Sequence, residues 1–127
     1  MIPPEQIEGK AEMFLDFEDR LTIFDTMVFC RFYRDFYTWE KLEEVIHKAT
    51  GLAAGEKVLK EKARAIATLI RRFNLREGMQ PEDERLPKAL HQPLQDTGQV
   101  ITENEMEVML KEYYLLQGWD ETGQPRD

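Results

Sequence analysis

The chain has 127 residues, 42% hydrophobic and 33% charged, a composition typical of a soluble protein with much exposed helix and one core. Its net charge of −8 argues against general affinity for nucleic acid. No apolar run approaches the roughly 20 residues that cross a bilayer, and the start lacks a signal-like apolar segment. A single cysteine excludes a disulfide scaffold and fits a reducing compartment, so we expect a cytoplasmic protein. Because no long apolar run is present, we also expect no membrane association.

The first predicted element is an amphipathic helix over residues 9–29. Its apolar residues recur at spacings of three and four, which predicts one buried stripe made of Phe14, Phe17, Leu21, Phe24 and Met27. The opposite side is expected to be polar and consists of Asp16, Glu18, Asp19 and Arg20. We expect the helix to run without a break to the only cysteine, Cys30, which by composition alone is a buried thiol.

An aromatic cluster follows Cys30, and we expect it to pack as a core plug under a helix–helix turn. Its members are Phe32, Tyr33, Phe36, Tyr37 and Trp39. A second helix is predicted for residues 39–50, because Thr38 is a suitable N-cap and Gly51 a suitable residue just past the end. The side chains expected to face inward from this helix are Leu42, Val45, Ile46 and Ala49.

A third helix is predicted for residues 55–74, with Gly78 ending it. Its expected apolar face consists of Val58, Ala63, Ile66, Leu69, Ile70 and Phe73. Residues 57–76 also carry seven basic side chains and one acid, a net charge of +6, whereas residues 101–127 carry −5. We expect these charges to face each other or solvent; the alternative, a nucleic-acid stripe, lacks interleaved aromatic residues.

Residues 78–101 lose all periodicity and contain Pro81, Pro87 and Pro93, so they are predicted to be irregular. A connection of this length is commonly functional or disordered, and it could lie across another domain. The last helix begins at a capping box formed by Thr102 and Glu105. Its expected inward face is Met106, Met109, Leu110, Tyr113 and Tyr114, and Gly118 is expected to end it. The predicted fold is all-α, with about four helices and a long irregular proline-containing connection, in a single helical domain over residues 1–127.

Several kinds of catalytic site are excluded by the residues present. Glu44 and His47 form one Glu-x-x-His pair, but a di-iron bundle needs two, so His47 is expected to be exposed. The chain has no serine, which removes most nucleophilic acyl-transfer chemistry, and it has no glycine-rich phosphate loop. No active site is assembled by these residues alone.

Short motifs in register nevertheless resemble a known family across essentially the whole chain. They are the run FN-x-REG at residues 73–78, DERLP at 83–87, Tyr-Tyr at 113–114, Gly-Trp-Asp at 118–120 and Gly-Gln-Pro at 123–125. This pattern is similar to the C-terminal part of the tungsten-containing aldehyde:ferredoxin oxidoreductases. One departure is Gln117, where that family often has arginine.

The same resemblance implies roles for two residues near the end of the first helix. The family has an Asp-x-x-Gly-Leu-Cys motif whose aspartate contacts the pterin and whose cysteine is the fourth ligand of a 4Fe-4S cluster. In this sequence Asp25 and Cys30 keep the spacing, while Val28 and Phe29 replace the glycine and the leucine. The resemblance therefore implies Asp25 as a contact to a tungstopterin, a molybdopterin-type cofactor, and Cys30 as a metal ligand.

The sequence is thus interpreted as a fragment of a multidomain oxidoreductase that oxidises aldehydes to carboxylic acids and passes electrons to ferredoxin. The family's other three cluster cysteines and its tungstopterin domain are absent, so we expect this chain alone to bind neither cofactor and to be inactive. Its expected partners are the remaining domains or subunit and ferredoxin; a homo-oligomer stays open. The alternative is a free-standing helical interaction module without a redox role. A domain taken from a multidomain enzyme should expose apolar residues where its neighbour packed. We expect these exposed residues to include some of Phe29, Phe32, Tyr33 and Trp119.

Overall fold

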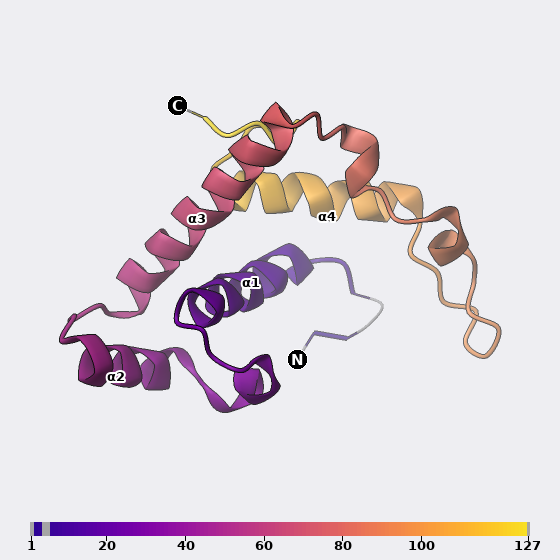
Figure 1. Ribbon diagram of the computed structural model, residues 1–127. Helices are drawn as coiled ribbons and strands as arrows, with labels where there is room; N and C mark the ends of the chain where they lie inside the picture. Colours follow the sequence, from indigo (N-terminus) through magenta and orange to yellow (C-terminus); the bar gives the residue numbers. More distant parts are fainter. Residues whose placement is uncertain (1, 4–5, 127) are drawn as a thin grey trace. The chain divides into compact units, whose positions relative to one another are not determined.

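The computed structural model describes residues 2–3 and 6–126, and in this part of the chain it contains four α-helices and no β-strand (Figure 1). The helices are α1 (Lys10–Thr26), α2 (Trp39–Thr50), α3 (Glu56–Arg76) and α4 (Glu103–Leu116). Three short 3-10 helices lie between them: η1 (Arg31–Phe36), η2 (Pro81–Glu84) and η3 (Lys88–His91). The all-α prediction is confirmed. No helix within the described residues is both long and apolar enough to span a membrane.

The chain divides into two compact units. Residues 16–70 form one, here called the Cys30 unit, and residues 1–15 with 71–127 form the other, here called the Arg71 unit. The divisions fall inside α1 and inside α3. Each unit has its own kind of interior, one apolar and one ionic, and the two are described separately. A single domain over the whole chain stays a prediction.

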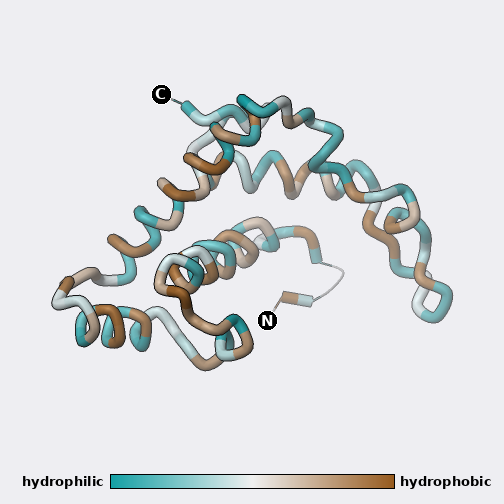
Figure 2. Tube along the Cα trace, in the orientation of Figure 1, coloured by the Kyte–Doolittle hydropathy of each residue, from teal (hydrophilic) through white to brown (hydrophobic). Residues whose placement is uncertain are grey.

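The Cys30 unit has an apolar core to which α1, α2 and α3 each contribute two buried residues. They are Ile23, Phe24, Leu42, Ile46, Leu59 and Ala63. The helices form this core because apolar and polar residues alternate along them with the helical period, which Figure 2 shows as brown and teal bands along α2 and α3. Trp39 packs against the core and donates its indole N–H to Asp16 Oδ1 at 3.0 Å.

Left-handed residues end all four helices. Glycines occupy this position after three helices, with φ of 75° at Gly51, 96° at Gly78 and 79° at Gly118. Glycine is favoured there because a Cβ atom disfavours positive φ. Thr38 caps α2 and accepts a hydrogen bond from the Lys41 N–H, and the Thr102–Glu105 capping box begins α4. These start and stop predictions are confirmed.

The first helix differs from its prediction in both its length and its buried face. It ends at Thr26 rather than continuing to Phe29 and Cys30. The buried positions include Ala11, Leu15 and Asp19, whereas Phe14 is exposed. The predicted stripe and the residues that are in fact buried both have helical spacing. Tertiary packing, and not periodicity, therefore decides which face of α1 is buried.

Asp19 was expected on a polar face, but its side chain is 1% exposed. Burial raises the pKa of its carboxyl group, and the Arg64 guanidinium, with Nε at 3.4 Å from Oδ2, opposes that rise. The buried carboxylate is thus partly compensated by a half-exposed arginine of α3.

The aromatic cluster is mostly outside the core, which corrects the expected core plug. Phe32 is 93% exposed, and Tyr33 and Phe36 are also exposed, whereas Tyr37 packs against the core. The reason is local: η1 is a short 3-10 helix that starts immediately after Cys30, and none of its residues is buried. The apolar face of α3 is likewise only partly covered, because Ala63 is buried while Leu69, Ile70 and Phe73 are exposed.

Candidate functional site

The segment from Phe24 to Arg31 turns sharply at the end of α1. The Phe29 N–H donates to the Phe24 carbonyl oxygen at 3.0 Å, and the Val28 N–H donates to the Asp25 carbonyl oxygen at 3.1 Å. These two bonds are those of a Schellman motif, in which the residue after the helix cap has a positive φ. Val28 holds that position with φ of 57°. It is the only non-glycine residue with positive φ in the described part of the chain.

The following residue, Phe29, fixes this turn to the core of the Cys30 unit. Its ring lies 5.4 Å from the Phe24 ring and 5.8 Å from the Tyr37 ring, centroid to centroid. A hydrophobic contact between these two motif positions commonly accompanies a Schellman motif. Phe29 is accordingly half-buried rather than exposed. The turn is therefore held both by backbone hydrogen bonds and by aromatic packing, although a valine occupies the position that favours glycine.

We predict that Val28→Gly raises the free energy of unfolding by about 1 kcal/mol. A side chain at positive φ costs about 1–2 kcal/mol, and the branched Cβ of valine lies at the costly end; part of the gain is offset by the freedom of glycine in the unfolded chain. The Val28 side chain is 90% exposed, so its removal loses little packing. The measurement is chemical denaturation followed by circular dichroism.

The matched control is Gly118→Val, which places valine at the same position of the α4 Schellman motif. A Cβ atom at Gly118 would meet nothing within 4 Å, so only backbone strain applies. We expect a loss of about 1–2 kcal/mol. A destabilising Val28→Gly change would contradict the strain argument.

Asp25 and Arg31 form an ion pair across the turn. Arg31 Nε donates to Asp25 Oδ1 at 2.9 Å, and Arg31 Nη2 donates to Asp25 Oδ2. The Arg31 hydrogen bond holds the pKa of the Asp25 carboxyl below its usual value. Both side chains are exposed. Arg31 was not identified from the sequence, because a pairing of residues six apart across a turn has no helical period.

Cys30 is exposed and lies between the turn and η1, with an extended backbone (φ −72°, ψ 119°). This position corrects the expectation of a buried thiol at a helix end: the helix stops at Thr26, so Cys30 is outside it. Its carbonyl oxygen accepts a hydrogen bond from the Tyr33 N–H at 3.0 Å. The structure thus places the Asp25 carboxylate and the Cys30 thiol on either side of one tight turn, both accessible.

Several of the short motifs that resemble the family meet in the Arg71 unit around one buried arginine. Arg71 is 6% exposed, and its Nε donates to the Gly123 carbonyl oxygen at 2.8 Å. Its Nη1 and Nη2 pair with the two carboxylate oxygens of Glu84 at 2.6 and 2.8 Å. The guanidinium carbon also lies 5.3 Å from the ring centroids of both Tyr114 and Trp119. The buried positive charge of Arg71 is therefore paired with the Glu84 carboxylate and also contacts two aromatic rings.

Tyr114 completes this network by donating its hydroxyl hydrogen to Glu84 Oε2 at 2.5 Å. Burial and this hydrogen bond raise the pKa of Tyr114 to about 12, so the neutral phenol is strongly favoured. Gly123 is required by close packing, because a Cβ atom there would lie 2.8 Å from Tyr114 Cζ and also clash with Arg71. Trp119 is buried, in contrast to Phe32 and Tyr33.

The DERLP, Tyr-Tyr, Gly-Trp-Asp and Gly-Gln-Pro motifs therefore each contribute to one structural network or to the turn beside it. Asp120 Oδ1 accepts from the backbone N–H groups of Thr122 and Gln124, both at 2.9 Å, which shapes the turn that presents Gly123. These motifs hold the Arg71 unit together.

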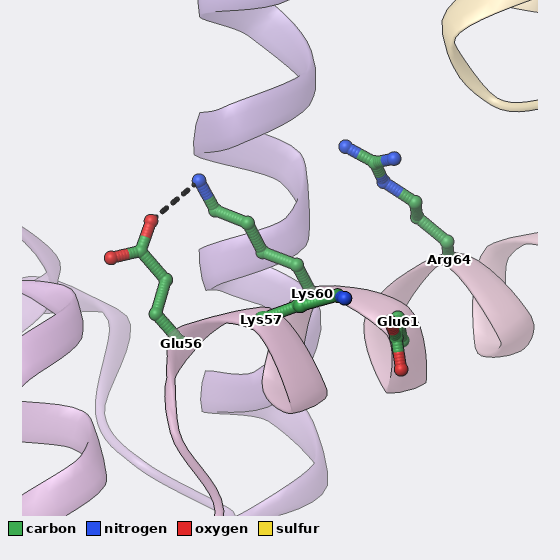
Figure 3. Close-up of a pocket in the computed structure, with 5 residues that line it drawn as sticks. All are labelled: Glu56, Lys57, Lys60, Glu61 and Arg64. Atoms are coloured by element: carbon green, nitrogen blue, oxygen red, sulfur yellow. Dashed lines mark ion pairs between the residues drawn. The ribbon is translucent and has the colours of Figure 1, made fainter.

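Four of the seven basic residues of α3, Lys60, Arg64, Arg71 and Arg76, form ion pairs within the described part of the chain. A shallow hollow on this helix is lined by Glu56, Lys57, Lys60, Glu61 and Arg64. Figure 3 shows Lys60 reaching Glu56, and Lys60 Nζ lies 2.8 Å from Glu56 Oε1 and 2.7 Å from Asp16 Oδ1. The hollow contains no nucleophile or ligand set, and its arrangement is that of a salt-bridged surface.

Comparison with known proteins shows to which family the chain belongs. The family model described as "Aldehyde ferredoxin oxidoreductase, domains 2 & 3" matches residues 1–127, which is the whole chain. The chain belongs to the aldehyde ferredoxin oxidoreductase family. A curated relative, the tungsten-containing aldehyde ferredoxin oxidoreductase of Thermococcus kodakarensis, is 29% identical over 133 residues. That alignment covers 100% of this chain but 22% of the relative, so the chain spans about a fifth of its length. No solved structure matches the chain.

The site residues fit a part of the cofactor set that the resemblance implies. A 4Fe-4S cluster is held by four thiolates, and the exposed Cys30 thiol is suited to be one of them. Each Asp25 oxygen accepts from Arg31 and retains a lone pair for a further donor, such as a pterin N–H. Among the described residues, no group of three or more His, Cys, Asp or Glu side chains could hold a metal ion. The remaining ligands of such a cluster would have to come from other polypeptide.

Proposed function

We propose that this chain completes the cofactor site of a tungsten-containing aldehyde ferredoxin oxidoreductase. Cys30 supplies one thiolate to a 4Fe-4S cluster, and the Asp25 carboxylate accepts hydrogen bonds from the pterin. When bound in the intact enzyme, these cofactors would supply the chemistry that oxidises an aldehyde to a carboxylic acid and delivers electrons to ferredoxin. The chain's own residues bind and orient the cofactors.

The observation that carries this proposal is the backbone at Val28. The family motif has glycine at this position, and Val28 adopts the left-handed conformation that glycine favours. The turn between Asp25 and Cys30 therefore has, at Val28, the backbone conformation that a glycine would favour, despite the two substitutions. This supports the transfer of both roles to these residues.

The exposed apolar surface beside Cys30 is consistent with the docking of a partner at this face. Phe32, Tyr33 and Phe36 follow the cysteine in η1 and are exposed, as is Val28 before it. Exposed apolar clusters of this kind usually mark interaction surfaces. A partner that brings the other cluster thiolates to Cys30 would cover these residues, so cofactor assembly and docking are proposed to use the same face.

The test is reconstitution of the chain with iron, sulfide and a partner polypeptide that carries the tungstopterin domain and the other three cysteines. We expect cluster absorption that Cys30→Ala reduces strongly, because a cubane with three protein thiolates has lost an anchor. Cluster absorption and iron content are measured on the purified complex. The control is Phe32→Tyr, which keeps an aromatic ring on the docking face and should assemble the cluster normally.

A Cys30→Ala complex with unchanged cluster absorption and iron content would show that Cys30 is not a ligand. If that complex also formed with unchanged affinity, the chain would be an interaction module without a redox role. The two readings are thereby separated by one pair of measurements.

A further inference from the structure

Arg31 joins the two halves of the proposed cofactor segment through its charge. It directly follows Cys30, and its side chain returns across the turn to Asp25 at the end of α1. The fork of Nε and Nη2 contacts both carboxylate oxygens, the geometry in which arginine gives the most directional pairing. Lysine could not reproduce this fork, because an ammonium group is a point charge.

We propose that Arg31 is a positioning residue, which fixes the Asp25 carboxylate relative to Cys30 so that pterin and cluster are held by one preset unit. The inference rests on the proposed function of Asp25 and Cys30. It goes beyond that function by adding a residue that touches neither cofactor in its role.

The surrounding contacts explain why a single ion pair can have this effect. The backbone from Phe24 to Phe29 is already fixed by two hydrogen bonds and by the Phe29 ring. The side chain of Asp25 is exposed, so its orientation depends on its own partner rather than on packing. Arg31 supplies that partner and leaves each carboxylate oxygen able to accept another hydrogen bond. Removing Arg31 should therefore free the carboxylate without disturbing the turn.

Arg34 offers a matched control within the same 3-10 helix. Its Nε lies 3.8 Å from Asp35 Oδ1, and both side chains are exposed, as in the Asp25–Arg31 pair. The two pairs thus have the same charge and a similar surface setting. They differ in that only the Asp25–Arg31 pair involves a residue of the proposed site and forms the two-bond fork across the turn.

The experiment compares Arg31→Gln, Arg31→Lys, Arg34→Gln and Asp25→Asn in the reconstituted complex. Pterin content is measured by fluorescence of the released pterin, and cluster content by absorption. We expect Arg31→Gln to lower pterin content by roughly 10-fold, the low end of what loss of an outer partner costs, with cluster content and melting temperature unchanged. Arg31→Lys should resemble Arg31→Gln, and Arg34→Gln should resemble wild type.

The outcomes separate this inference from the function on which it rests. If Asp25→Asn lowers pterin content and Arg31→Gln does not, Arg31 has no positioning role although Asp25 binds the pterin. Full pterin content with Arg31→Lys would overturn the fork geometry as the cause. If Asp25→Asn itself leaves pterin content unchanged, the proposed role of Asp25 is wrong.

Discussion

Glu84→Ala is expected to lower the free energy of unfolding of the Arg71 unit by about 3–5 kcal/mol, the cost of removing one partner from a buried ion pair. The substitution leaves the Arg71 guanidinium, 6% exposed, without its carboxylate. It also removes the acceptor of the Tyr114 hydroxyl. The effect is measured by denaturant unfolding followed through Trp119 fluorescence in a Trp39→Phe background, because Trp119 lies against Arg71.

The control for this prediction is Glu77→Ala. Glu77 also pairs with an arginine, Arg76, at 3.0 Å, but both side chains are exposed. Surface pairs of this kind contribute about 0–1 kcal/mol, so a small effect is expected. Equal effects of the two substitutions would mean that the network around Arg71 does not hold this unit together.

Phe24→Ala is expected to cost about 3–5 kcal/mol, the usual range for removing a buried phenylalanine. Phe24 is 0% exposed, and its ring packs edge-on against Phe29 and Tyr37, at centroid distances of 5.4 and 5.3 Å. The loss also removes the contact that anchors Phe29 after the turn. Stability is measured by denaturation, and the turn by hydrogen exchange of the Phe29 amide, which bonds to the Phe24 carbonyl and should exchange faster.

Phe32→Ala is the matched control, because this phenylalanine is 93% exposed. Its removal should change stability by no more than about 0.5 kcal/mol. Similar costs for Phe24→Ala and Phe32→Ala would show that the ring of Phe24 is not the centre of this core. Unchanged exchange at Phe29 would show that the turn holds without it.

The Glu84→Ala and Phe24→Ala predictions test the two units one at a time, because the interiors of these units differ. The Cys30 unit is stabilised mainly by apolar burial among α1, α2 and α3. The Arg71 unit encloses an arginine, a glutamate and two aromatic rings. The short family motifs at residues 73–125 belong to the second, where Glu84, Tyr114, Trp119 and Gly123 make structural contacts with Arg71. Asp25 and Cys30, which carry the proposed chemistry, lie in the first.

The sequence by itself determined the four helices and, except at the end of α1, where they begin and end, because these features depend on neighbouring residues. Thr38 and the Thr102–Glu105 box satisfy free amides of the first turn, and Gly51 and Gly118 adopt the left-handed conformation that closes the last. The same local logic located the irregular connection after Gly78. The family motifs, also short and local, led to the correct family.

Only the tertiary structure decided which face of α1 is buried and which polar groups meet across long stretches of sequence. Phe14 and Asp19 both have helical spacing to apolar neighbours, yet Asp19 is the buried one, and Arg64 of α3 partly compensates its charge. Arg71 meets Gly123, 52 residues later, through packing that no period encodes. The early end of α1 at Thr26, followed by the left-handed Val28, likewise depends on Phe29 reaching the core, because valine alone would not favour a left-handed turn.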